Sequence, residues 1–221
     1  MTVEFGHKLK NARGEEPKSR LAERLGLHHS TLSVLEAAKR EPSGKLAYIL
    51  LQGLAIEGAE RPRFLLSAAG LSEITIDALL DVGKIGKLHV MDMPVDALLQ
   101  DWENSTDSER EELEKNFSLV SQVRYYKERT IFTTNVVAIN SGYADASGIS
   151  HLKAGDKKLP GQEHIKGLLY GLQIPPSARA AFVLIARGHS LNRTLTELSH
   201  VSPVNSGELQ PGIVTQLPTP R

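Results

Sequence analysis

Two short runs of apolar residues near the amino terminus have helical spacing and are separated by a sharp break. Leu21 lies on the apolar face of the first run, and Leu32 and Leu35 lie on the apolar face of the second. Gly26 stands between the runs and permits the left-handed backbone conformation that a tight turn requires. The pattern therefore predicts a helix, a turn and a second helix within residues 17–42.

The outward face of the second predicted helix carries small and mostly polar side chains. Its members are His28, His29, Ser30, Thr31, Ser33 and Val34. A short helix of this kind suits the major groove of double-stranded DNA, where polar side chains contact base edges and a valine methyl fits against thymine. The basic residues that we expect to contact phosphates are Lys18, Lys39 and Arg40.

Three further helices are predicted around this pair. Apolar residues at helical spacing mark residues 5–13 and 60–69 as helices. Ser43 is a favourable N-cap for another helix that reaches residue 54. Residues 1–71 are therefore predicted to form one five-helix domain.

Several positions of this domain occur together in a known combination. They are Leu21, Ala22, Gly26, Ser30, Thr31, Leu32, Ser33, Leu35, Glu36, Lys39, Arg40, Pro42 and Ser43. With them, residues 5–71 resemble the phage-repressor-like family of Cro/CI or XRE type, which implies a lambda-repressor-like helix-turn-helix domain that binds DNA. Two positions depart from the family pattern: Lys18 stands where Gln is frequent, and Ala38 where Gly is usual. Lys18 favours a phosphate contact over base reading.

The apolar spacing of the first domain recurs from residue 122 onward. Residues 147–155 align with residues 30–38, and Gly142 aligns with Gly26, with a one-residue insertion in each of two loops. We interpret residues 122–200 as a second, diverged helix-turn-helix-like domain. The residues that would contact DNA in this copy are Ser147, Gly148, Ser150, His151, Lys153, Lys157 and Lys158.

Residues 72–121, between the two copies, predict an acidic helical connector. Short helices are expected over residues 74–80, ended by Gly83, and over residues 94–102. A capping box at residues 106–109 opens a long helix that is expected to continue to about residue 126.

Charge is distributed unevenly, although the 26 basic and 26 acidic residues balance over the whole chain. The net charge is +3 over residues 1–70, −8 over 71–121, +6 over 122–193 and −1 over the remainder. Two basic ends that flank an acidic middle suit DNA contact through the ends. The segment 201–221 is rich in Pro and Gly and predicts an extended or disordered tail.

Several classes of function are disfavoured by what the sequence lacks. There is no cysteine, and no phosphate loop, metalloprotease motif, nucleophile elbow or dinucleotide fingerprint, so we expect no enzyme, cofactor or metal site. No apolar run approaches a membrane span and no signal-peptide core opens the chain, which predicts a cytoplasmic location without membrane contact.

These observations predict an all-α protein of two five-helix helix-turn-helix domains joined by an acidic helical segment. The expected function is sequence-specific DNA binding by a transcription regulator, in particular a repressor that occupies an operator. We expect the connector to hold the copies apart and the chain to form a homodimer, with a pseudo-symmetric monomer as the other arrangement. A protein-interaction or antitoxin-like module is the alternative function. A small-molecule-sensing regulator is a third, with its effector unknown.

Overall fold

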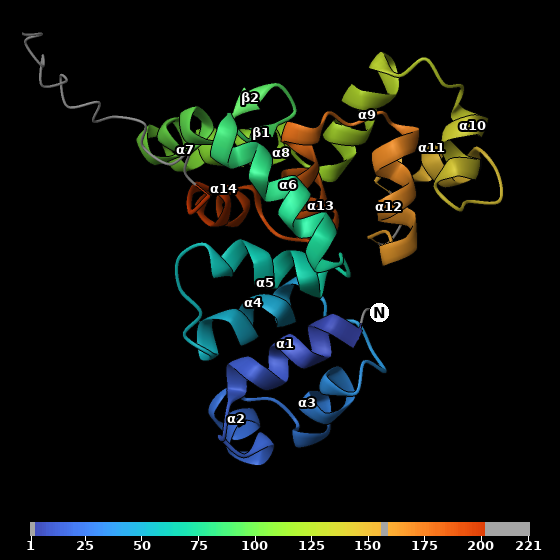
Figure 1. Cartoon of the computed structure of the whole chain (residues 1–221). Helices are drawn as coiled ribbons and strands as arrows, with labels where there is room; N and C mark the ends of the chain where they lie inside the picture. Colours follow the sequence, from blue (N-terminus) through green and yellow to red (C-terminus); the bar gives the residue numbers. More distant parts are fainter. Residues whose placement is uncertain (1–2, 156–158, 202–221) are drawn as a thin grey trace, which may run out of the picture.

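The computed structural model describes residues 3–155 and 159–201, and these residues are almost entirely helical (Figure 1). They form fourteen helices and one two-stranded hairpin, which confirms the predicted all-α class. None of the helices in the described part is long and apolar enough to cross a membrane. The predicted tail lies outside the described residues from position 202 onward.

The amino-terminal domain has the five predicted helices. They are α1 (Val3–Arg13), α2 (Lys18–Arg24), α3 (His29–Glu36), α4 (Gly44–Gly53) and α5 (Glu60–Ala68). Ser43 caps α4, because its hydroxyl accepts a hydrogen bond of 3.2 Å from the Leu46 amide. The rings of Phe5 and Phe64 meet edge to face and join α1 to α5 in the core of this domain.

The next helix is longer than the sequence predicted. α6 (Glu73–Ile85) begins after Ser72 and continues through Gly83, where the pattern predicted an end. Gly83 is buried, and a Cβ there would lie about 3 Å from Leu88 and Val201 side-chain atoms. The glycine thus allows close packing inside the helix and does not terminate it. A short antiparallel hairpin follows, β1 (His89–Val90) with β2 (Met93–Pro94), which the pattern did not predict.

The long helix that was predicted to open at the capping box is two helices, α8 (Asp107–Asn116) and α9 (Leu119–Arg129). They follow α7 (Val95–Asn104), and α8 opens with the expected capping box. Ser118 interrupts the helix because its hydroxyl accepts a hydrogen bond from the Ser121 amide and so caps α9. Ser118 therefore marks the start of α9, although the apolar spacing on either side of it is that of one continuous helix.

The carboxy-terminal half contains five more helices. They are α10 (Thr134–Asn140), α11 (Ser147–Ala154), α12 (Gln162–Gly171), α13 (Pro176–Ala186) and α14 (Leu191–Ser199). Helix α13 is the centre of the molecule, since it contacts α5, α6, α9, α12, α14 and β1. Most of its residues are buried, in keeping with an apolar sequence that has no polar stripe.

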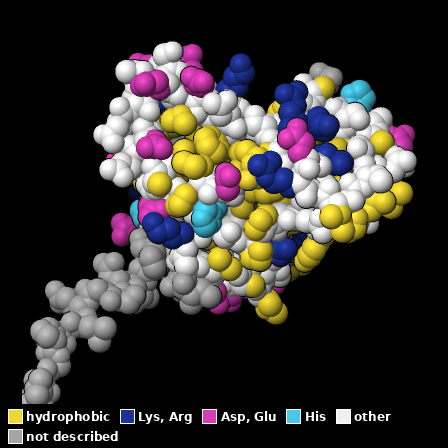
Figure 2. Space-filling model, turned by 90° about the horizontal axis from the view of Figure 1, so that it is seen from above, with side chains coloured by type: hydrophobic (Ala, Val, Ile, Leu, Met, Phe, Trp, Pro, Cys, Tyr) yellow, Lys and Arg dark blue, Asp and Glu magenta, His cyan; other side chains and the backbone are white. Residues whose placement is uncertain are grey.

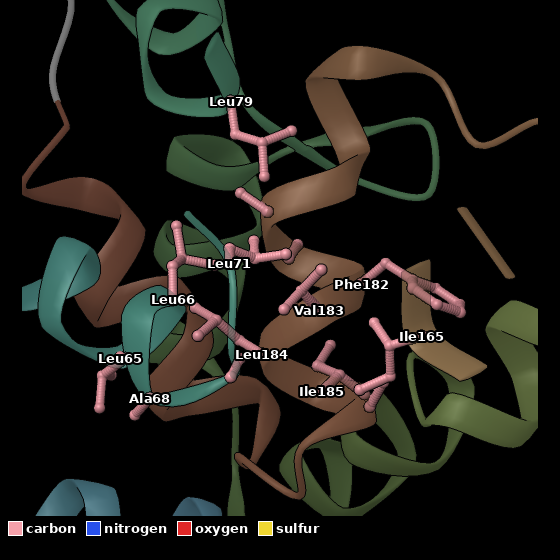
Figure 3. Close-up of a cluster of buried hydrophobic side chains, with 14 of the residues drawn as sticks. Leu65, Leu66, Ala68, Leu71, Leu79, Ile165, Phe182, Val183, Leu184 and Ile185 are labelled. Carbon is pink, nitrogen blue, oxygen red and sulfur yellow. The ribbon is translucent and has the colours of Figure 1, made fainter. Parts of the chain in front are cut away.

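The amino-terminal domain and the carboxy-terminal half pack directly on each other, whereas the connector was predicted to hold the two copies apart. Helices α5 and α13 touch directly, and Figure 3 shows Leu66 and Leu71 next to Val183 and Leu184. All four side chains are almost fully buried. Both helices are apolar on more than one side, so each needs a second layer, and each supplies it to the other.

Candidate nucleic-acid interface

Helices α2 and α3 pack against each other around a turn that depends on Gly26. This residue has φ of +63°, and the Leu27 amide donates a 2.8 Å hydrogen bond to the Ala22 carbonyl across the turn. Leu32 and Leu35 of α3 are buried, as are Leu21 and Ala22 of α2. The apolar faces of both helices are thus buried in the domain core, and the opposite side of α3 is exposed to solvent.

The solvent side of α3 consists of small and polar side chains. His28, His29, Ser30 and Ser33 are exposed, whereas Thr31 and Val34 are half-buried at the edges of this surface. A row of this kind along a two-turn helix has the size and hydrogen-bonding capacity that a major groove accepts.

His28 has a structural task that the sequence did not indicate. It occupies the N-cap of α3, where its Nδ1 accepts a 3.3 Å hydrogen bond from the Ser30 amide and lies 2.7 Å from the Ser30 hydroxyl. The ring of His29 lies next to it, with 4.4 Å between centroids. The cap fixes the start of α3 and ties the His28 ring to the first turn of the helix.

A network of charges joins the three first helices behind the exposed face. Glu36, at the end of α3, accepts a 2.7 Å hydrogen bond from Arg13 of α1, and Lys18 of α2 lies 2.9 Å from its other oxygen. The Glu36 side chain is 6% exposed and that of Arg13 is 10% exposed. Burial alone would raise the pKa of the Glu36 carboxyl, but the hydrogen bonds from Arg13 and Lys18 outweigh burial and hold the pKa below its ordinary value.

The three basic residues that were predicted to contact phosphates therefore differ in their surroundings. Lys18 is half-buried and engaged with Glu36, so its first role is to hold α2 against α3. Lys39 and Arg40 are exposed just beyond the end of α3. Arg13, which sequence reasoning missed, belongs to the same cluster. One indirect signal for this role of Arg13 was present in the sequence: Glu36, its partner, is among the positions that carry the family resemblance.

A second helix pair of the same form follows in the carboxy-terminal half. α10 and α11 pack together around Gly142, whose φ is +74°, and the Tyr143 amide donates a 2.9 Å hydrogen bond to the Ala138 carbonyl. Helix α9 packs on α11 as α1 packs on α3. In place of the Glu36 network, Arg124 of α9 donates a 2.8 Å hydrogen bond to the Lys153 carbonyl.

The predicted contact residues of this second pair are only partly presented to solvent. Ser147, Ser150 and His151 are exposed. Gly148 is buried beneath the ring of Tyr143 and presents no surface, because the tyrosine fills the space that a side chain would take. Lys153 is half-buried, and Lys157 and Lys158 lie outside the described residues.

Two helices joined by a glycine turn, with a buried inner side and an exposed polar side, define a helix-turn-helix domain. Residues 9–60 match the family model Helix-turn-helix, of the XRE type. The match supports a DNA-binding transcription regulator of the XRE type. The comparisons with curated proteins and with solved structures found no significant match.

Proposed function

We propose that the protein is a sequence-specific transcription regulator that represses by occupying an operator through α3. One observation carries the proposal: in a domain of this family, α3 presents an exposed polar face next to Lys39 and Arg40. Base edges are contacted by small polar side chains, whereas phosphates are contacted by basic ones, and the two kinds are arranged here in that order along the chain.

The exposed residues of α3 are assigned to base contacts, with Ser30 and Ser33 at their centre. His28 and His29 extend this surface at the start of the helix. Lys39 and Arg40 are assigned to phosphates. Lys18 is bound to Glu36, so it attracts DNA through its positive charge and is not assigned a direct phosphate contact. No catalytic step is part of the proposal.

The alternative of a protein-interaction module is favoured by one observation, and it concerns α10. Ile139 of α10 is 65% exposed and Ile131, just before the helix, is 83% exposed. Figure 2 shows apolar side chains gathered at the edge of the molecule where α10 lies. Apolar surface of this kind suits contact with protein more than with phosphate. The surface around α3 has no such patch among the residues described.

Footprinting on the region upstream of the protein's own gene tests the proposal. We expect wild-type protein to protect a defined site and a reporter behind that site to be repressed. Ser33→Glu removes a base contact and places a negative charge in the groove, so affinity for the site should fall about 5- to 150-fold. Ser33 is exposed and its change leaves the core intact.

The matched control is Ser108→Glu, which adds the same charge on the exposed surface of α8, outside the proposed interface. Its footprint and its reporter repression should equal those of the wild type. Equal protection by the Ser33→Glu and wild-type proteins would show that α3 is not the reader. Protection that raises reporter expression would keep DNA binding but contradict repression.

A further inference from the structure

Eight of the eleven left-handed backbone positions in the described residues correspond between the two halves of the chain. The pairs are Gly26 and Gly142, Ala38 and Gly155, Ala55 and Gln173, and Gly70 and Gly188, all with positive φ. Members of a pair are 116 to 118 residues apart, and the difference corresponds to the two single-residue insertions. Three of the eight residues are not glycine, and such residues rarely adopt this conformation. The coincidence therefore points to two copies of one backbone.

The correspondence extends to side chains and to a sixth helix. Arg61 donates a 3.1 Å hydrogen bond to the Ile56 carbonyl, and Arg179, at the matching position, donates one of 2.9 Å to the Ile174 carbonyl. Ser72 caps α6 as Ser190 caps α14, each at the same distance along the chain from its glycine turn. The repeating unit is thus α1 to α6, matched by α9 to α14.

Matching helices of the two units make reciprocal contacts across one shared interface. Helix α6 of the first unit packs on α13 of the second, and α14 of the second packs on α5 of the first. Between them α5 meets α13, its own counterpart. Reciprocal packing of this kind is the mark of two-fold symmetry at an isologous interface.

A second reciprocal contact comes from the starts of α4 and α12. At Gly44 a side chain would collide with the Arg187 carbonyl, so the start of α4 touches the end of α13. At Gly70 a side chain would collide with Gln162, so the start of α12 touches the end of α5. Gly44 and Gln162 are matching positions, and each contacts the other unit.

One contact across the interface has no equivalent and fastens the two units together. Arg61 of the first unit binds Glu197 of the second through two hydrogen bonds of 2.9 and 2.7 Å. Glu197 is 1% exposed. The position that matches Glu197 in the first unit is Leu79, so the pair forms only once in this chain and a homodimer of the first unit would not reproduce it.

We propose that one chain is an internal pseudo-dimer whose α3 and α11 read two unlike, inverted half-sites on the same double-stranded DNA. Elements related by a two-fold axis lie at the same level along it, so α3 and α11 share one end of the molecule. In Figure 1 α3 lies at the bottom and α11 at the upper right, whereas α6 and α14 lie nearer the centre and the left. The proposal requires half-sites with centres about 34 Å apart, one turn of DNA, as paired helix-turn-helix domains use.

The half-sites differ because the two outward faces differ. Ser30, Ser33 and Val34 of α3 correspond to Ser147, Ser150 and His151 of α11. A histidine replaces a valine at one position, so a contact with a thymine methyl becomes one with a hydrogen-bonding base edge. This inference rests on the proposed DNA-binding function and replaces the predicted homodimer with a single chain.

The test uses the full chain and a DNA site selected from a random-sequence library. We expect one chain of 24.2 kDa per bound DNA, measured as the mass of the complex in sedimentation. The footprint should contain two different half-sites. The protein concentration is set high enough that one intact recognition helix alone still occupies its half-site. Under this condition Ser33→Glu should lose protection over the half-site of α3, and Ser150→Glu over the half-site of α11. Ser108→Glu should protect both halves.

Three other results would overturn the proposal. Two chains per site would restore the ordinary homodimer. Full protection by Ser150→Glu, with protection lost only in Ser33→Glu, would leave α11 without a DNA contact while the function of α3 stands. Absence of any selected site for the wild-type chain would remove the proposed function itself, and the pseudo-dimer reading with it.

Discussion

At the scale of single residues, Ala38 stands where a glycine is expected and keeps the conformation of one. It has φ of +55° directly after α3, and its counterpart Gly155 has φ of +81° after α11. A Cβ in this region lies too close to the following carbonyl and costs roughly 1–2 kcal/mol. The departure from the family pattern is therefore a local strain, which the tertiary contacts of α3 hold in place.

Replacing Ala38 by glycine should stabilise the protein. The relieved strain exceeds the extra entropy of glycine in the unfolded chain, so we expect a gain of about 0.5–1 kcal/mol in the free energy of unfolding. Urea denaturation measures it. The control is Ala37→Gly, since Ala37 has φ of −77° and gains nothing from glycine. A loss of stability in Ala38→Gly equal to that in Ala37→Gly would contradict the strain.

A second residue makes stability depend on pH. His189 is 5% exposed, and burial, with the neighbouring charges of Arg193 and Arg187, lowers its pKa to about 4. The unfolded chain binds a proton near pH 6.5, whereas the folded chain does not until about pH 4. Stability is therefore greatest above pH 6.5 and falls as the pH drops toward 4.

We expect a loss of about 2 kcal/mol between pH 7 and pH 5 from this group, measured by urea denaturation at the two pH values. His189→Leu should remove most of that dependence, because leucine occupies the matching position 71 and does not titrate. The range stays above the ordinary pKa of carboxyl groups, so they contribute little. An unchanged pH dependence in His189→Leu would show that other groups cause it.

At the scale of elements, the charged network behind α3 should determine how firmly the first three helices hold together. Glu36→Gln keeps the shape of the side chain but removes the charge that pairs with Arg13 and Lys18. A partly buried guanidinium then loses its charged partner and keeps only hydrogen bonds to the Gly14 and Glu16 carbonyls, so we expect a loss of roughly 1–3 kcal/mol in the free energy of unfolding. Thermal or urea denaturation measures it.

The matched control for that change is Glu23→Gln, because Glu23 lies exposed on α2. It should alter stability by less than about 0.5 kcal/mol. Equal stability of Glu36→Gln and Glu23→Gln would mean that the network contributes no net free energy.

Elements set by local spacing were predictable, and those set by tertiary packing were not. The first five helices follow from apolar periodicity, Gly26 and Ser43, all of which act within a few residues. Gly83 was taken for a helix end because its use as a packing site depends on Val201, far away in sequence. The caps at His28 and Ser118 were missed because neither interrupts the apolar pattern.

The site was predictable in outline for the same reason. The outward positions of α3 follow from helical spacing, whereas the pairing of Lys18 with Glu36 depends on the angle between α2 and α3. Gly148 was assigned to the second interface by alignment, but the ring of Tyr143 covers it. A one-to-one alignment transfers positions and cannot transfer the packing around them.

At the scale of the whole molecule, α13 joins both halves into one core. Leu184 is fully buried between them, so Leu184→Ala should lower the free energy of unfolding by about 2–5 kcal/mol. Both halves should lose that stability together. Fluorescence of Trp102, in the connector, and far-UV circular dichroism should therefore give coincident transitions in this variant and in the wild type. Two separate transitions would contradict a shared core.

The measurement that tests the DNA-binding account most directly is affinity for DNA as a function of salt concentration. Each phosphate contact releases counterions and adds about 0.9 to the slope of log affinity against log salt. Titrations of labelled DNA followed by fluorescence anisotropy should give a steep decrease for the wild type. For Arg40→Ala the slope should be flatter by about one unit, with affinity reduced on all sequences alike. An affinity independent of salt would contradict the account, and an Arg40→Ala slope equal to that of the wild type would contradict the phosphate contact assigned to Arg40.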